Sequence, residues 1–471
     1  MAIARKIAYN VIFNVITKLI STILALVGIG FITRYLGKEG FGNYSTVLAF
    51  FAFFGSAADL GLYAITAREI SRAGANEKKI LGNAFTLRLC TSFAVFFLTP
   101  ILVFFLPYSN DVKIGILIAA ASFVFSSTYM VLNGVFQKNL AMDKVATAEV
   151  LGKVIQIAII ILAVRNDLGF ITIILSVLFA MVFNFIVVFL LVQKYIPLKL
   201  QFDFTYWKKF LKESAPLGLS AVVIFIYFKI DTILLSVLKT SSEVGIYNAA
   251  YKVIENVSFF PAMIIGLMFP MFSRHIFSDK KHFRHLANET FKVFSILIVP
   301  LIIGTLFLSE GIINLIGGAA FTDASNTLRI LIFALGFIFF GGFFNNILIA
   351  GNHQKKMLGA LTGCAIFNVV ANLIFIPIYS YTAAAVISVA TESLVALAGL
   401  VLTIKYVGYV PTVKKLPGIL LSGFFMAVFL YVFKDISFVL RFVGSSIVYM
   451  LSLWATKTIT IKELSGIFSQ K

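Results

Sequence analysis

The stretch FITIILSVLFAMVFNFIVVFLLV, residues 170–192, contains no ionisable side chain and is apolar along nearly its whole length. About 20 such residues, coiled as a helix, cross the hydrocarbon layer of a membrane. Every backbone N–H and C=O group in that layer must be paired within the protein, so only helices and closed barrels can span it. Barrel strands alternate polar and apolar residues over about 10 positions. Because the quoted stretch does not alternate, it predicts a transmembrane helix.

Similar apolar windows recur along the whole chain. Short connectors with Gly, Pro, Asn or charged residues separate them, for example residues 37–40 (GKEG) and 107–111 (PYSND). We therefore predict an all-α polytopic membrane protein with about 14 transmembrane helices. The predicted spans are residues 9–33, 41–65, 81–105, 114–136, 146–163, 170–192, 214–238, 245–271, 291–308, 328–350, 358–376, 382–404, 417–433 and 437–456.

The composition supports a membrane protein. Of its 471 residues, 60% are hydrophobic and 13% are charged, whereas roughly 25% of a soluble domain is charged. The net charge of +19 would suggest a nucleic-acid partner in a soluble protein. Here the Lys and Arg residues concentrate in alternate connectors, as the positive-inside rule requires of the cytoplasmic side. We predict a multi-pass protein of the cell (cytoplasmic) membrane with both termini in the cytoplasm and no nucleic-acid partner.

Cysteine and histidine usage does not indicate a redox or metal site. Cys90 and Cys364 lie in apolar spans far apart in the sequence. His275, His282 and His285 share one basic connector without acidic or Cys partners at the spacing of metal ligands. We expect no cofactor and no bound metal.

Two halves of the chain resemble each other weakly. Residues 41–44 (FGNY) and 244–247 (VGIY) open the second span of each half, and Asn133 has a counterpart in Asn345. Paired repeats around a central cavity are the usual architecture of a secondary transporter. The predicted domains are a six-helix N-terminal lobe (1–192), a cytoplasmic linker (193–213), a six-helix C-terminal lobe (214–404), and two additional helices with a cytoplasmic tail (405–471).

Ionisable side chains occur deep within the predicted spans. A charge at mid-bilayer costs about 2.5–3.5 kcal/mol on insertion scales, so each needs a partner or a hydrated cavity. We assign no catalytic residue. The basic residues at depth, predicted to bind an anionic substrate, are Lys18, Arg88, Lys153, Lys229 and Lys252. The acidic candidates for binding a coupling ion are Asp59, Asp231, Glu255 and Glu392.

Sequence spacing predicts how some of these charges pair. Similar depth on consecutive spans indicates an ion-paired cluster of Lys18, Asp59 and Arg88. Glu149 and Lys153 are four residues apart and share one helix face. By contrast, residues 229 and 231 point apart on one helix, so Lys229 and Asp231 need separate partners or a water-filled cavity.

Less functional interpretations stay open for several of these residues. Lys18 and Arg88 could extend their long stems to the inner headgroups. Lys252 and Glu255, three apart, could be a self-contained structural pair. Glu392 could be neutral and bonded to a neighbouring helix.

Several short motifs resemble those of a known family. Residues 58–62 (ADLGL) and 67–72 (AREISR) resemble the end of span two in polysaccharide and O-antigen flippases of the multidrug/oligosaccharidyl-lipid/polysaccharide (MOP) exporter superfamily. Residues 229–235 (KIDTILL), 244–252 (VGIYNAAYK) and 269–270 (FP) resemble spans seven and eight of the same family.

The resemblance implies a flippase that moves polyprenyl-pyrophosphate-linked oligosaccharide repeat units from the inner to the outer leaflet by alternating access of its two lobes. It also implies that anionic membrane lipids and polysaccharide assembly proteins are candidate partners, and we expect a monomer. Fourteen spans are also found in lipid II flippases, but these carry cavity arginines where this chain has Lys18 and Lys252.

Two alternatives within transport are a cation-coupled multidrug exporter and a lipid II flippase. A drug exporter should depend on the acidic residues rather than on Lys229 and Lys252. We do not expect an enzyme, because the longest outer loop, residues 309–327, holds only Glu310 and Asp323 as acids, and no nucleophile–base pair is evident.

Overall fold

The structure is a computed structural model that describes the backbone of residues 2–59, 61–72 and 74–459; side chains 2–9, 11–12, 57–59 and 216–217 are not described. Within the described residues the chain is helical almost throughout and has no strand, which confirms the predicted all-α polytopic fold. Its elements are α1 (Ala2–Asp59), α2 (Leu62–Ile70), α3 (Glu77–Phe104), α4 (Asn110–Lys138), α5 (Met142–Arg165), α6 (Gly169–Gln193), α7 (Phe204–Leu238), α8 (Ser241–Val257), α9 (Phe259–His275), α10 (Lys280–Gly317), the 3₁₀ helix η1 (Ala319–Phe321), α11 (Ala324–Ala350), α12 (Gln354–Val407), α13 (Leu416–Val432) and α14 (Phe438–Ala455).

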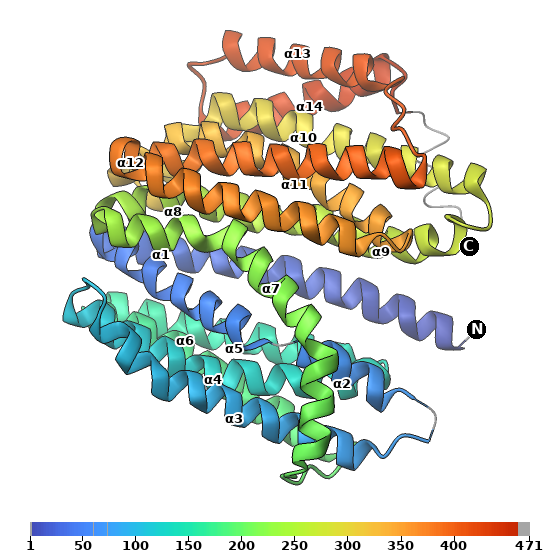
Figure 1. The fold of residues 1–471 in the computed structure, drawn as a ribbon. Coiled ribbons are helices and arrows are strands. Elements are labelled where there is room, and N and C mark those ends of the chain that lie inside the picture. The colour runs from blue at the N-terminus through green and yellow to red at the C-terminus, as the bar shows by residue number, and fades with distance from the viewer. Residues whose placement is uncertain (1, 60, 73, 460–471) are drawn as a thin grey trace. The chain divides into compact units, whose positions relative to one another are not determined.

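Two of these helices each contain two predicted spans. α1 holds the first and second spans, and α12 holds the eleventh and twelfth. The backbone leaves the helical conformation at Gly37 (φ 64°, ψ −170°) in α1 and at Ser380 (φ 52°, ψ −136°) in α12. Figure 1 shows each helix as two straight segments that meet at a bend. A positive φ costs little at Gly37 because glycine has no Cβ. The bend at this residue confirms the connector predicted at residues 37–40.

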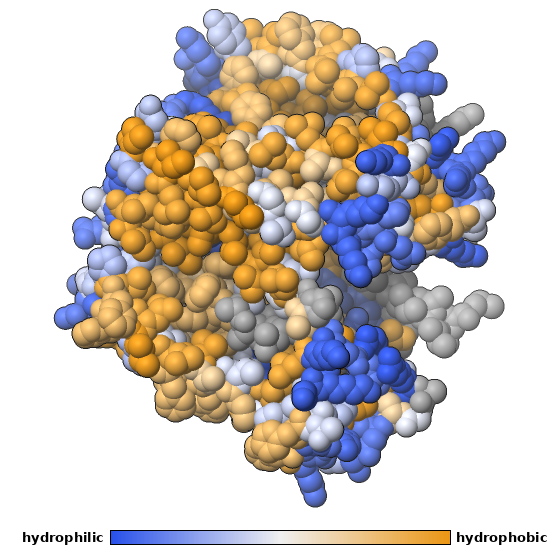
Figure 2. All heavy atoms as spheres, in the orientation of Figure 1, coloured by the Kyte–Doolittle hydropathy of each residue, from blue (hydrophilic) through white to orange (hydrophobic). Residues whose placement is uncertain are grey.

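The lengths of the helices fit a membrane. Among the described residues, 11 helical segments are long and apolar enough to cross one, and α13 is a shorter apolar helix. The eighth predicted span corresponds to α8 and α9, which meet at Ser258. Figure 2 shows hydrophobic residues over the flanks of the helices and hydrophilic residues gathered near their ends. The chain is therefore a multi-pass membrane protein.

One predicted span boundary is wrong, and one helix extends beyond its predicted span. The span predicted at 41–65 ends early, because α1 stops at Asp59 and Gly61 (φ 66°) precedes a new helix, α2. The span predicted at 214–238 agrees with the apolar segment Gly218–Leu238, although the helix that contains it begins earlier, at Phe204. The carboxylate of Asp203 accepts a hydrogen bond from the Tyr206 amide at 3.0 Å and caps this helix.

The chain forms two compact units. The first comprises the residues up to Asn248 together with Ile316–Ala320 and Ile376–Ser380; the second comprises Ala249–Leu315, Phe321–Phe375 and Tyr381–Lys471. The two units are groups of residues that pack together, whereas the predicted lobes are parts of the chain that move together during transport. The lobe boundaries stay a prediction.

In the first unit α4 lies at the centre and packs against α1, α3 and α6. Small residues let these helices approach closely, as is common in membrane bundles. At Gly152 of α5, for example, a Cβ atom would lie 2.3 Å from the side-chain oxygen of Asn184 on α6. An apolar cluster including Leu81, Leu132 and Val192 fills the space between α3, α4 and α6.

In the second unit the two additional helices, α13 and α14, pack against each other and against α10. Leu308 of α10 shares an apolar cluster with Met426 of α13 and Leu453 of α14. The Tyr449 hydroxyl also donates a hydrogen bond to the Ile296 carbonyl at 2.9 Å. The C-terminal pair is thus attached to this unit by both apolar packing and a hydrogen bond.

Candidate functional site

Four of the predicted deep charges lie on α1 and α5, which pack against each other. Lys18 on α1 is exposed and interacts electrostatically with Glu149 on α5, which is also exposed. One turn further along α5, the ammonium group of Lys153 is 2.8 Å from the Gln156 side-chain oxygen. The structure therefore brings Lys18 near Glu149, a proximity that the sequence did not predict. The side chain of Asp59, the predicted third member of the Lys18 cluster, lies outside the described residues.

Arg88 is enclosed between α3 and α4. Its Nε donates to the Ser127 carbonyl at 3.3 Å, and its guanidinium carbon lies 5.7 Å from the centre of the Phe123 ring. Only 2% of the residue is exposed. In this conformation its charge is therefore held inside the protein, without the headgroup contact that snorkelling would require.

Asp231 on α7 is buried and belongs to a polar network with α8. It accepts a short hydrogen bond from the hydroxyl of Tyr247 and a second one, 2.8 Å long, from the Thr232 amide. The hydroxyl of Thr232 lies 3.3 Å from the side-chain oxygen of Asn248. Lys229 on the same helix is half-buried. Asp231 cannot pair with Lys229 on its own helix, and the network gives it a partner on another helix, Tyr247 of α8.

In the second unit, Lys252 and Glu255 pair with each other on α8. The ammonium group lies 2.7 Å from the carboxylate, and the side chains are 16% and 37% exposed. This geometry matches the self-contained pair that the sequence left open. Glu392 on α12 is buried and interacts electrostatically with Cys364 in the other segment of that helix.

Sequence reasoning missed three buried polar residues next to Glu392. The amide of Asn368 donates to the Thr391 hydroxyl at 3.0 Å, and the amide of Asn372 donates to the Asn368 carbonyl at 2.9 Å. The first bond connects the two segments of α12, whereas the second lies within the segment before the bend at Ser380. The detectable signal was the four-residue spacing of two Asn in an apolar span, which places both amides on one helix face.

The two echoed motifs of the sequence touch each other, which the sequence did not predict. A Cβ atom on Gly42 of α1 would lie 1.7 Å from the carbonyl oxygen of Ser241, and one on Gly245 of α8 would lie 2.0 Å from that of Lys38. Gly42 thus faces Ser241, four residues before Gly245, and Gly245 faces Lys38, four residues before Gly42. The contact therefore has approximate two-fold symmetry. We call it the glycine crossing.

Two further hydrogen bonds involve α1 and α8, the helices of the glycine crossing. The hydroxyl of Thr33 donates to the Ile316 carbonyl at 2.8 Å, and the hydroxyl of Ser380 lies 2.5 Å from the carboxylate of Glu243. Segments from both halves of the sequence are therefore joined here within the first unit.

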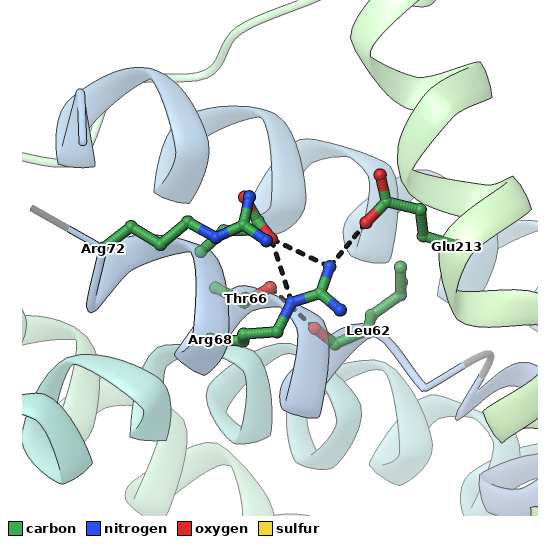
Figure 3. A network of polar contacts seen from close by, with 6 residues as sticks. Leu62, Thr66, Arg68, Arg72 and Glu213 are labelled. Carbon is green, nitrogen blue, oxygen red and sulfur yellow. Dashed lines mark hydrogen bonds and ion pairs between the residues drawn. The ribbon is translucent and has the colours of Figure 1, made fainter. Parts of the chain in front are cut away.

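A second polar network joins α2 to α7 (Figure 3). The guanidinium group of Arg68 lies 2.5 Å from the carboxylate of Glu213 on α7 and 2.8 Å from that of Glu69. Arg72 also pairs with Glu69, at 2.8 Å. Hydrogen bonding to Glu69 raises the pKa of Arg68, so this residue keeps its charge.

We expect the Arg68–Glu213 pair to contribute little stability despite its short distance. The two side chains are 48% and 37% exposed, and exposed ion pairs are typically worth under about 1 kcal/mol. A double-mutant cycle with Arg68→Ala and Glu213→Ala, read by thermal unfolding in detergent, measures their coupling. A coupling energy above about 2 kcal/mol would contradict this expectation.

The comparisons with known proteins agree with one another. Residues 7–276 match the family model described as polysaccharide biosynthesis protein. A Shigella flexneri protein, provisionally named an O-antigen transporter, is 24% identical over 349 residues, covering 71% of this chain and 82% of its own length.

Solved transporter structures share the fold. A lipid II flippase, MurJ, in an inward closed conformation aligns with 96% of this chain and 99% of its own, with a TM-score of 0.77 at 18% identity. An inward-facing multidrug resistance MATE family transporter of the MOP superfamily aligns with 84% of this chain and 98% of its own, with a TM-score of 0.70 at 13% identity. The fold is that of the MOP transporters, and the chain belongs to the polysaccharide biosynthesis protein family.

Proposed function

We propose that this protein is a flippase that moves polyprenyl-pyrophosphate-linked oligosaccharide repeat units from the inner to the outer leaflet for cell-surface polysaccharide synthesis. The observation that carries the proposal is the family match over residues 7–276, a segment that contains every basic residue predicted at depth. The proposed transport requires no catalytic chemistry.

The charges of the chain suit such a cargo. A sugar pyrophosphate is a multiply charged anion that cannot cross hydrocarbon unaided. Lysine and arginine are the usual partners of phosphate groups. We propose that Lys18, Lys153, Lys229 and Lys252 contact the cargo during transport. Arg88 joins them only if α3 and α4 separate around it, since its side chain is enclosed here.

The acids predicted at depth are candidates for coupling the cycle to an ion. We propose Asp59, Asp231, Glu255 and Glu392 for this role. Asp231 and Glu392 are buried, so a change in their protonation or in a bound cation would alter the packing of their helices. We also propose that the protein lies in the cytoplasmic membrane with both termini inside, because Lys and Arg concentrate in the connectors assigned to that side.

A lipid II flippase is the second candidate. The MurJ structure aligns with nearly the whole chain, including the region of the two additional helices. The family match and the Shigella relative favour the oligosaccharide cargo instead. Cells that lack this protein distinguish the two, because stranded polysaccharide repeat units support the first candidate and stranded peptidoglycan precursor supports the second.

Lys229→Ala and Lys252→Ala are each expected to lower flipping at least tenfold while the protein still inserts, because each removes a positive charge proposed to meet the pyrophosphate. The measurement is the fraction of lipid-linked repeat units on the outer leaflet, with membrane abundance checked in parallel. Lys434→Ala, in the exposed connector before α14, is the matched control and should flip normally.

The pairing of Lys252 with Glu255 calls for one further variant. If Lys252 serves only to neutralise Glu255, the double variant Lys252→Ala/Glu255→Ala should restore flipping. If Lys252 binds the cargo, the double variant stays impaired. Restored flipping would remove Lys252 from the proposed site.

A further inference from the structure

Residues 197–203 (PLKLQFD) form a non-helical segment between α6 and α7, which we call the strap. In Figure 1 it leads into the lower end of α7. Leu198 packs against the apolar cluster of α3, α4 and α6, but from Leu200 on the side chains alternate in an unusual sense. Leu200 and Phe202 are 55% and 62% exposed, and Phe204, the first residue of α7, is 73% exposed. The polar residues between them face the protein.

The inward side of the strap is bonded to α3. The backbone N–H of Gln201 donates to the Thr86 hydroxyl at 3.0 Å, and the backbone N–H of Asp203 donates to the side-chain oxygen of Asn83 at 2.9 Å. The same oxygen of Asn83 accepts a hydrogen bond from the indole of Trp207 at 3.1 Å. Asn83 is fully buried, and its side-chain amide group also donates to the Gln201 side-chain oxygen at 3.2 Å. Three partners from the strap and α7 therefore converge on an interior side chain.

Close packing and an ion pair also hold the strap. A Cβ atom on Gly82 would lie 2.6 Å from the carbonyl oxygen of Lys199, so only glycine allows this approach. The ammonium group of Lys79 lies 2.9 Å from the carboxylate of Asp203, and this hydrogen bond lowers the pKa of Asp203. The outward direction of the apolar side chains is therefore set by fixed contacts.

In water the opposite arrangement would be expected, with apolar side chains facing the protein and polar ones facing the solvent. An apolar outer face is stable where it meets lipid. The strap contacts α3 between Lys79 and Thr86, within its first three turns, which is about 14 Å of helix from Glu77. If Glu77, where α3 begins, marks the membrane surface, this length reaches through the headgroup region to the adjacent acyl chains, where aromatic side chains are enriched.

Positive charge surrounds this apolar face. The rings of Phe202 and Phe204 contact that of Trp207, with centroids 5.9 Å and 5.2 Å apart. The acids nearby are paired, Asp203 with Lys79 and Glu213 with Arg68. The exposed lysines on the strap and the first turns of α7 are Lys199, Lys208, Lys209 and Lys212. Basic residues beside a membrane segment attract acidic lipid headgroups.

We propose that the strap and the first turns of α7 form a docking surface for acidic phospholipids. The apolar residues enter the border of the acyl chains, and the lysines bind the phosphate headgroups. This surface would hold the start of α7 at the interface, and it does not depend on the identity of the transported cargo.

The test uses Trp207 as a probe. The chain has two tryptophans, so W454F leaves Trp207 alone. The W454F protein is placed in nanodiscs that contain phosphatidylglycerol or phosphatidylcholine brominated on the acyl chains near the headgroup. We expect each brominated lipid to quench Trp207 emission. In nanodiscs that contain both lipids, with only one of them brominated, we expect brominated phosphatidylglycerol to quench at least twofold more strongly than brominated phosphatidylcholine. No quenching by either lipid, or equal quenching by both, would overturn the proposal.

Two variants identify the residues responsible. In the W454F background, replacing Lys208, Lys209 and Lys212 by Gln should remove the preference for phosphatidylglycerol while quenching persists. F202S/F204S should reduce quenching by both lipids at least twofold. The converse protein, W207F, reports from Trp454 on α14 and serves as the control, since the lysine variants should leave its quenching unchanged. A lysine variant that keeps the full preference would overturn the assignment of these residues.

Discussion

Gly42→Ala is expected to lower the thermal stability of the protein and to reduce flipping at least tenfold. The new Cβ atom would lie 1.7 Å from the carbonyl oxygen of Ser241, well inside van der Waals contact. Backbone oxygen cannot rotate away as a flexible side chain can, so α1 and α8 must move apart. Overpacking of this kind costs about 1–3 kcal/mol, and more when the backbone resists. Thermal unfolding in detergent and the leaflet assay measure the two effects.

The glycine crossing supplies its own controls. Gly245→Ala should have a similar effect, because its Cβ atom would lie 2.0 Å from the Lys38 carbonyl oxygen. The double variant should lose less stability than the sum of the losses in the two single variants, because helices that the first methyl group has forced apart can accommodate the second. Gly55→Ala, also on α1 but with no atom near its Cβ position, should remain close to wild type. A Gly42→Ala protein that unfolds and flips like Gly55→Ala would show that the two helices do not cross this closely.

Asp231→Asn is expected to abolish most flipping while leaving the fold intact. The single oxygen of the new amide can still accept from the Tyr247 hydroxyl, but the Thr232 amide then loses its acceptor, so we expect stability to fall by about 1 kcal/mol. The charge is lost, and with it the proposed ability of this residue to bind and release a coupling proton or cation. We expect at least a tenfold loss in the leaflet assay.

Three comparisons separate coupling from packing at this site. Asp231→Ala should lose flipping and also about 1–3 kcal/mol of stability, because the buried Tyr247 hydroxyl and the Thr232 amide both lose an acceptor. Tyr247→Phe keeps the charge of Asp231 and should retain more flipping than Asp231→Asn. Asp111→Asn, an exposed acid in the first turn of α4, should behave as wild type. Normal flipping by Asp231→Asn would remove Asp231 from the coupling candidates.

Hydropathy and charge spacing predicted the spans because the cost of placing a segment in lipid is the sum of local contributions. Each window of about 20 residues carries that cost by itself, wherever the rest of the chain lies. The bend at Gly37 was predictable for the same reason, since glycine and the charged residues after it interrupt an apolar window. The Lys252–Glu255 pair was likewise predictable from helix geometry alone.

The start of α7 at Phe204 was not predicted, because its first turns are too polar for a hydropathy window and depend on a cap from Asp203 and on the contacts of Asn83. Tertiary structure also decided the enclosure of Arg88, whose partners on α4 are far away in the sequence.

By itself, the sequence determined that this chain is a multi-pass helical membrane protein and which motifs resemble its family, and it predicted which charges lie within the spans. Only the tertiary structure decided that Gly42 meets the backbone of α8, that Asp231 bonds Tyr247, and that the strap turns its apolar side chains outward. The physical reason is that insertion into lipid depends on the composition of each segment, whereas contacts depend on which faces of distant segments meet.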